Sequence, residues 1–197
     1  MYLRGFEATY VYIATLASRR IIDLGSGTGR ALRDMHAQYT CLGLEFVGTG
    51  LIGDSLVFAP YRVTPCELMR GFAPASVGGC LSVFGAPHYS KHMNLVLERV
   101  DEILMSGGIA KFALAASSRG SGKHRDALNV EYTETNARIR EFFEQRGYGV
   151  ASRDVTVPHD DAWRGLAFLA VKPTTAMDIS ALAVSLMEAD AKLFDQE

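Results

Sequence analysis

A carboxylate followed by closely spaced glycines is the feature of this sequence best suited to binding a ligand. Asp23 lies in an apolar, β-branched run, and the next residues include the segment Gly25-Ser26-Gly27-Thr28-Gly29. Apolar residues then recur at helical spacing, so the pattern predicts a buried strand, a tight turn and the start of a helix. Glycines remove the Cβ and let a ligand approach the backbone, while a helix start offers unpaired N–H groups. We refer to Gly25–Gly29 as the glycine turn and expect a ligand there.

The spacing of these residues discriminates between ligands. The dinucleotide fingerprint is G-x-G-x-x-G, in which the third glycine comes one residue later than Gly29, and Arg30 occupies that place here. The negative charge of Asp23 before the first glycine disfavours a pyrophosphate and suits a ligand with an ammonium group. A tight turn that binds nothing is the remaining alternative.

A second carboxylate, Glu45, follows Asp23 by about 20 residues and comes directly after another apolar run, Cys41–Leu44. An acid at the end of the neighbouring strand can hydrogen-bond the hydroxyls of a ribose. The order of acid, alternating glycines and second acid resembles motif I and the following acidic position of the class I S-adenosylmethionine-dependent methyltransferases.

This resemblance implies a cofactor, S-adenosyl-L-methionine, and a product, S-adenosyl-L-homocysteine. It implies that the methionine portion is held by Asp23 and by the glycine turn, namely Gly25, Ser26, Gly27 and Gly29. It further implies that Glu45 holds the ribose and that Phe46 flanks the adenine.

Further cofactor contacts are expected where the third and fourth strands end. Cys66 or Glu67 follows the third strand, at a place where the family often has an acidic residue near the adenine amino group. Phe84 ends the fourth strand and so falls at the crevice outside the carboxyl ends of the strands. Asp54 follows Glu45 by too few residues for a helix and a further strand, so we interpret it as a solvated helix residue.

His88 and Tyr89 follow the fourth strand and are the candidate catalytic residues. The ordinary pKa of a histidine lets it act as a general base near neutral pH. A base is needed only if the attacking atom of the substrate is protonated, and a loop histidine without a catalytic role is the alternative.

The composition restricts the class of protein. The chain has 197 residues, 48% of them hydrophobic, and a formal net charge of −2. This net charge does not indicate binding to nucleic acid or to membranes. Its three cysteines are widely spaced in apolar runs, which favours buried free thiols over a disulfide or a metal site. No signal-peptide pattern and no long apolar stretch is found, so the default expectation is a cytoplasmic protein.

The predicted fold is an α/β three-layer sandwich around a mostly parallel, Rossmann-like sheet of seven strands, with one antiparallel strand near the edge. The antiparallel strand is expected because residues 150–157 and 166–171 are separated by a loop too short for a crossover helix. Residues 1–173 form the methyltransferase-like domain, in which residues 1–19 are a helix that either packs on the sheet or forms a partial lid. Residues 174–197 are an amphipathic helix that either packs back on the domain or forms a homodimer.

The sequence therefore predicts a methyltransferase that acts on a small molecule, because little chain lies outside the cofactor fold and no nucleic-acid module is found. One alternative is an enzyme that methylates RNA or protein and uses Lys123, His124 and Arg125, in a polar loop, as a basic contact. The other alternative is a catalytically silent partner subunit with the same fold.

Overall fold

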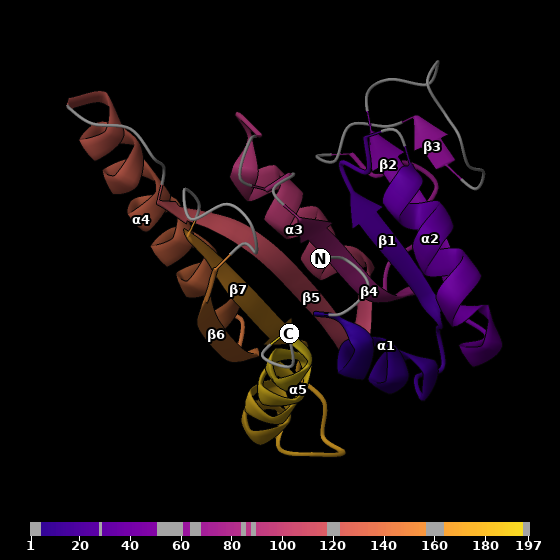
Figure 1. Cartoon of the computed structure of the whole chain (residues 1–197). Coiled ribbons are helices and arrows are strands. Elements are labelled where there is room, and N and C mark those ends of the chain that lie inside the picture. Colours follow the sequence, from indigo (N-terminus) through magenta and orange to yellow (C-terminus); the bar gives the residue numbers. More distant parts are fainter. Residues whose placement is uncertain are drawn as a thin grey trace.

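The computed structural model describes residues 5–27, 29–50, 61–63, 68–83, 86–87, 90–117, 123–156 and 164–194. Helices and strands alternate along most of the chain (Figure 1). The helices are α1 (Glu7–Ala14), α2 (Arg30–Tyr39), a 3-10 turn η1 (Thr40–Leu42), α3 (Met93–Ile103), α4 (Lys123–Glu144) and α5 (Ile179–Phe194). The strands are β1 (Arg20–Leu24), β2 (Glu45–Gly50), β3 (Tyr61–Val63), β4 (Val77–Val83), β5 (Leu104–Ser117), β6 (Gly149–Thr156) and β7 (Arg164–Val171).

The strands of the described residues form one mixed sheet in the order β3-β2-β1-β4-β5-β7-β6. Six of these seven strands have at least five residues, and the edge strand β3 has three. The pairs from β3 to β5 are parallel, whereas β7 runs antiparallel to both β5 and β6. The predicted mostly parallel sheet with an antiparallel strand near one edge is thus confirmed.

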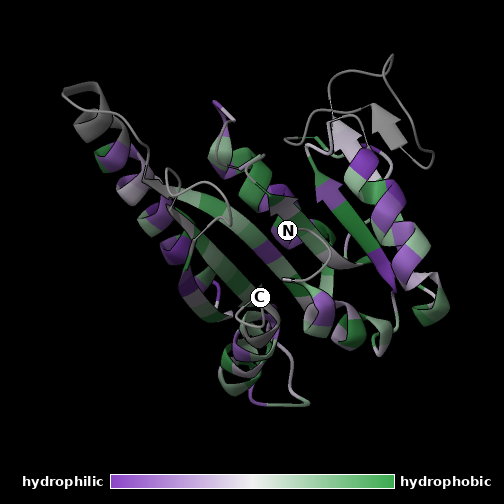
Figure 2. Cartoon of the chain, viewed as in Figure 1, coloured by the Kyte–Doolittle hydropathy of each residue, from purple (hydrophilic) through white to green (hydrophobic). Residues whose placement is uncertain are grey.

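Helices cover both faces of the sheet and give the predicted three layers. One core cluster joins α1, α2 and α5 to one face, and the other cluster joins α3 and α4 to the opposite face. The first strand shows the alternation, since Ile21 belongs to the first cluster and Ile22 and Leu24 to the second. In Figure 2 the strands are mostly green, and the helices α2 and α4 carry purple residues between green ones, as amphipathic helices do.

The first and last described helices pack together on the sheet. The helix α5 shares its core with α1, and Ala183, Leu186 and Met187 are buried there. A Cβ placed on Gly149 of β6 would lie 2.2 Å from the carbonyl oxygen of Ile179, so glycine permits the close approach of α5. Of the two alternatives for the C-terminal helix, the structure thus has the one in which it packs back on the domain, and the homodimer stays a prediction.

The helix α1 likewise packs on the sheet. Its residues Tyr10 and Ile13 are fully buried, and the Tyr12 hydroxyl donates a hydrogen bond to the carbonyl oxygen of Gly107, at 3.0 Å. This packing matches the first of the two interpretations of the N-terminal helix, and a role as a partial lid stays a prediction.

One predicted element boundary and one expected burial were wrong. The helix α4 begins at Lys123, so the backbone of the basic segment 123–125, which we expected in a loop, is helical. The helix α3 ends at Ile103, because Leu104 already has extended backbone angles and opens β5. Among the cysteines, Cys80 is buried and free as expected, Cys41 is exposed, and Cys66 lies outside the described residues.

Candidate functional site

The carboxylate of Asp23 is buried and carries no compensating group from the described residues. Only 1% of the residue is exposed, and neither carboxylate oxygen has a hydrogen-bond partner among the described residues. Burial raises the pKa of Asp23 from its ordinary value of 3.8 to about 7. Burying a charge is costly unless another group compensates it, so the end of β1 carries an acceptor suited to a cationic ligand.

The glycine turn directly follows Asp23 and has the backbone that its composition predicts. Gly25, Gly27 and Gly29 have φ angles of 75°, 55° and 70°, in the left-handed region that favours glycine. A Cβ placed on Gly27 would meet no atom within 4 Å, so the side of the turn at Gly27 is open to a ligand. The turn thus presents bare backbone beside the buried carboxylate.

Neighbouring strands hold this turn in place. The N–H groups of Gly25 and Ser26 both donate to the carbonyl oxygen of Thr49 on β2, at 3.1 and 3.0 Å. The Thr49 hydroxyl donates to the carbonyl oxygen of Asp23 at 3.3 Å, and the Ser82 hydroxyl on β4 donates to that of Leu24 at 3.2 Å. Sequence reasoning missed Thr49 and Ser82, although hydroxyl residues inside apolar strands were a detectable signal.

The helix α2 begins at the end of the turn. Gly29 is its N-cap, has a left-handed backbone and supplies no side-chain cap. The first N–H groups of an α-helix have no intrahelical acceptor and attract negative charge. The carboxylate of Asp23 and the start of α2 therefore place an acceptor and a set of donors beside one turn, as a zwitterionic group requires.

The prediction for Glu45 was wrong in its placement. Glu45 opens β2 and lies opposite Arg20, while Asp23 lies opposite Gly48. Three residues of strand separate these pairs, which is about 10 Å. The turn η1 and Gly43, with a φ of 68°, delay the strand, so the apolar run that precedes Glu45 does not form it. Glu45 instead forms an exposed ion pair with Arg20 at 2.9 Å, at the opposite end of β1 from the glycine turn.

Phe46 is also misplaced by the sequence prediction. It is 1% exposed and lies in the core beneath α1, with its ring edge-on to Tyr10 at 5.6 Å between centroids. It therefore does not line the crevice at the carboxyl ends of the strands. The residue that ends β2 is Gly50, which has no side chain to offer a ribose.

The remaining predicted site residues lie outside the described part of the chain. These are the cofactor candidates Cys66, Glu67 and Phe84, the catalytic candidates His88 and Tyr89, and the dismissed Asp54. All of them stay predictions. No group of three or more His, Cys, Asp or Glu side chains that could hold a metal ion occurs within the described ranges.

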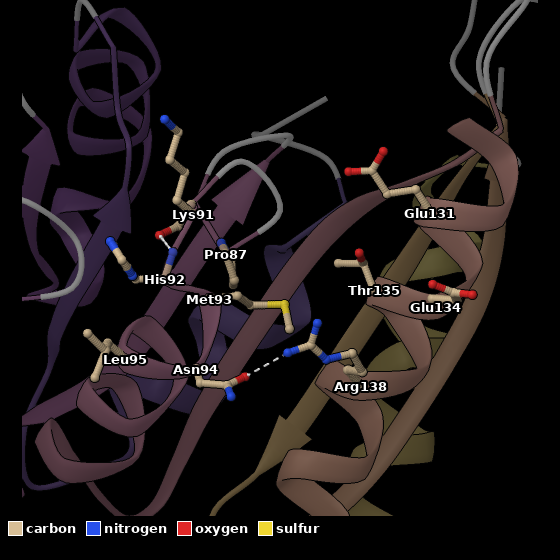
Figure 3. Close-up of a pocket in the computed structure, with 11 residues that line it drawn as sticks. Pro87, Lys91, His92, Met93, Asn94, Leu95, Glu131, Glu134, Thr135 and Arg138 are labelled. Atoms are coloured by element: carbon tan, nitrogen blue, oxygen red, sulfur yellow. Dashed lines mark hydrogen bonds between the residues drawn. The ribbon is translucent and has the colours of Figure 1, made fainter. Parts of the chain in front are cut away.

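A pocket of about 440 Å³ lies between the start of α3 and the middle of α4, on the face opposite α1 and α2. Figure 3 shows its lining from these two helices and from the segment after β4. Its lining comprises Pro87, Ser90, Lys91, His92, Met93, Asn94, Leu95, Glu131, Glu134, Thr135 and Arg138. This volume is ordinary for a small-molecule site.

Solved structures of methyltransferases share this architecture. The Haemonchus contortus phosphoethanolamine N-methyltransferase 2, in complex with S-adenosyl-L-methionine, superposes with a TM-score of 0.61 and 16% identity over 85% of this chain and 52% of that one. The chain thus spans about half the length of that enzyme. The Streptomyces coelicolor geranyl diphosphate C-methyltransferase gives a TM-score of 0.59 and 13% identity over 86% of this chain and 76% of that one. The chain has the fold of S-adenosylmethionine-dependent methyltransferases.

A third structure with the methyltransferase fold is the Burkholderia thailandensis 1,6-didemethyltoxoflavin-N1-methyltransferase. It has a TM-score of 0.56 and 17% identity over 87% of this chain and 79% of that one. No protein-family model matches the sequence, and neither does any curated protein. Within the described residues, no helix has the length and apolar character needed to cross a membrane.

Proposed function

We propose that the protein is a methyltransferase that uses S-adenosyl-L-methionine to methylate a small-molecule acceptor and releases S-adenosyl-L-homocysteine. One observation carries the proposal: the buried carboxylate of Asp23, which has no hydrogen-bond partner in the described part of the chain, adjoins a turn of three left-handed glycines. The amino acid portion of the cofactor has an ammonium and a carboxylate, which suit Asp23 and the start of α2 respectively. The fold is the one shared with the structures named above.

When bound, the cofactor supplies a methyl group on a positively charged sulfur, and an acceptor lone pair takes this methyl as the C–S bond electrons pass to sulfur. The residues of this chain contribute by binding and orienting. Asp23 fixes the ammonium, the glycine turn allows close approach, and Thr49 and Ser82 hold the end of β1 rigid. Proximity and alignment of this kind lower the barrier of a transfer between two bound molecules.

The residue that the sequence predicted to hold the ribose is not part of this proposal. Glu45 is not proposed for the ribose, because Glu45 lies at the opposite end of β1 and pairs with Arg20. Cys66, Glu67 and Phe84 remain the proposed contacts beyond the described residues, and His88 and Tyr89 the proposed catalytic candidates.

The proposal is tested by calorimetric titration of the full chain with S-adenosyl-L-methionine and S-adenosyl-L-homocysteine. Loss of a charge-assisted hydrogen bond makes the Asp23→Asn variant bind about ten to a hundredfold more weakly. The matched control is Glu45→Gln, which removes a carboxylate from the other end of the sheet and leaves the affinity within about twofold. Equal affinities of wild type and Asp23→Asn would overturn the assignment of Asp23.

Methyl transfer is measured separately with labelled cofactor, a set of small metabolites and bulk RNA. Transfer to a small molecule supports the proposal. Transfer to RNA alone supports the alternative that was linked to residues 123–125. Cofactor binding without transfer to any acceptor identifies a catalytically silent subunit.

A further inference from the structure

The pocket between α3 and α4 contains an arginine that does not use the partner offered by its own helix. Glu134 and Arg138 are four residues apart on α4, in the order that favours an ion pair. Six residues further along α4, Arg140 and Glu144 do form an i,i+4 ion pair, at 3.2 Å, although they stand in the reverse order. Arg138 instead extends across the pocket, where it donates a long hydrogen bond of 3.4 Å to Asn94 Oδ1 on α3 (Figure 3).

The guanidinium of Arg138 lines the pocket and uses one of its donors for Asn94, which leaves other donors for a ligand. A guanidinium has five N–H donors in a planar fork that matches a carboxylate or a phosphate. In the described residues, no ion pair involves Arg138, and Asn94 is its side-chain partner. This end of the pocket is suited to an anionic group.

The opposite end carries a negative charge. Glu131 lies seven residues before Arg138 on α4, about 10 Å along the helix axis, and Thr135 lies between them. Figure 3 shows Glu131 further toward the start of α4 than Arg138, and the Met93 side chain, from α3, between the two helices. Within the described ranges Glu131 forms no ion pair, so its carboxylate is available to a cationic or amine group.

The pocket also lies beside the edge of the sheet where the glycine turn is found. Pro87 lines the pocket and follows β4, and β4 pairs directly with β1. The carboxyl ends of neighbouring parallel strands lie at one edge of the sheet, so Pro87 and the glycine turn both follow strands that end at this edge. In-line transfer requires that kind of adjacency.

We infer that this pocket binds the methyl acceptor, and that the acceptor is a small amphoteric molecule with an anionic group on Arg138 and an amine on Glu131. This inference rests on the proposed function. The amine nitrogen forms the new N–C bond, the C–S bond breaks with its electron pair on sulfur, and the displaced ammonium proton leaves to solvent past the exposed Glu131.

The test uses the full chain and three sets of simple probes: ω-amino acids and ω-aminoalkyl phosphates of increasing length, alkylamines, and alkyl carboxylates. Binding is measured by calorimetry with S-adenosyl-L-homocysteine present, and methyl transfer is measured with labelled cofactor. Amphoteric probes are expected to bind and to be methylated, and the amines or carboxylates alone to bind about tenfold more weakly or not at all. The amino acid and aminoalkyl phosphate arms distinguish a carboxylate from a phosphate as the anionic group.

The variants Arg138→Gln and Glu131→Gln should each raise the KM for an amphoteric probe about tenfold or more while the Kd of the cofactor stays unchanged. The matched control is Arg140→Gln, which removes an arginine from the same helix outside the pocket and leaves both constants unchanged. Equal KM values for Arg138→Gln and Arg140→Gln, or cofactor binding without binding of any amphoteric probe, overturn this inference and leave the proposed function standing. Absence of cofactor binding overturns the proposed function itself.

Discussion

Two carboxylates on the same side of the sheet are almost fully buried, yet they differ completely in their partners. Asp23 and Asp190 are 1% and 2% exposed. Asp190, on α5, forms an ion pair with Lys111 and accepts hydrogen bonds from the Ala8 N–H and the Thr9 hydroxyl, each at 2.6 Å. The carboxylate of Asp23 has no hydrogen-bond partner among the described residues.

The positive partner of Asp190 is itself held on several sides. Lys111 donates to the carbonyl oxygen of Gly5 at 2.6 Å and lies 4.5 Å from the centre of the Phe6 ring. Burial lowers the pKa of Lys111, and Asp190 opposes that shift. A buried charge whose partners are all present is compensated within the fold. A buried charge without partners destabilises the fold unless a ligand compensates it. The comparison therefore distinguishes a structural carboxylate, Asp190, from the one that we propose binds the cofactor, Asp23.

The largest expected effect on stability comes from removing Lys111, the positive partner of the buried Asp190. Lys111→Met leaves Asp190 as an uncompensated buried charge and should lower the free energy of unfolding by about 3–5 kcal/mol. Chemical denaturation at neutral pH measures this change. The double variant Lys111→Met, Asp190→Leu removes both charges and should regain much of the loss. A single variant as stable as the wild type would contradict the assigned role of the pair.

Neutralising Asp23 should stabilise the unliganded fold, whereas removing Lys111 should destabilise it. The folded-state pKa of Asp23, about 7, lies above its ordinary value, so ionising this group penalises the unliganded fold as the pH rises from about 4 to about 7. Asp23→Asn should therefore raise the free energy of unfolding at pH 8 by about 1–3 kcal/mol, after the cost of a buried amide. At pH 5 the gain should shrink, because Asp23 is then mostly protonated in the wild type. A variant less stable than the wild type at both pH values would sink this prediction.

The same titration should appear in cofactor binding. Only the ionised form of Asp23 attracts an ammonium group, so the Kd for S-adenosyl-L-methionine should stay constant above pH 7. Below pH 7 the Kd should rise about tenfold for each unit, since each unit is about 1.4 kcal/mol. Calorimetry at several pH values between about 5.5 and 8 measures how the Kd depends on pH. The Asp23→Asn variant should lack this pH dependence. A Kd that is independent of pH would show that Asp23 does not ionise on binding.

The smallest effect should come from replacing Glu45, the exposed carboxylate that the sequence predicted to hold the ribose. Glu45→Gln breaks the ion pair with Arg20, in which 52% of the Glu45 side chain is exposed. Pairs of this kind contribute at most about 1 kcal/mol, so thermal unfolding should shift by a few degrees or less. A large loss of cofactor affinity in this variant would restore Glu45 to the site.

The sequence predicted what depends on neighbouring residues and failed where distant pairing decides. The strand, glycine turn and helix around Asp23 form a local unit, and their residue types specify the turn. The position of Glu45 depends on the register of β2 against β1, which η1 and Gly43 shift. The pair Lys111 and Asp190 joins residues 79 positions apart, and only the lone lysine in an apolar strand could have indicated it.

The pocket was missed for a related reason. Its two walls come from α3 and α4, and the sequence placed the start of α4 in a polar loop. Glu131, Thr135 and Arg138 share one face only once the helix extends through residue 131. Their alignment therefore appears with the tertiary structure and not with any short motif.

The contact between Asp190 and the start of α1 also has a consequence for biosynthesis. The carboxylate that caps the earliest described helix belongs to the latest one, so vectorial translation exposes α1 long before its cap exists. Lys111 is likewise synthesised long before Asp190, the carboxylate that neutralises it. A nascent chain stalled before residue 179 should hold α1 without this hydrogen-bond acceptor and Lys111 without its counter-ion, and completion of the last helix should supply both.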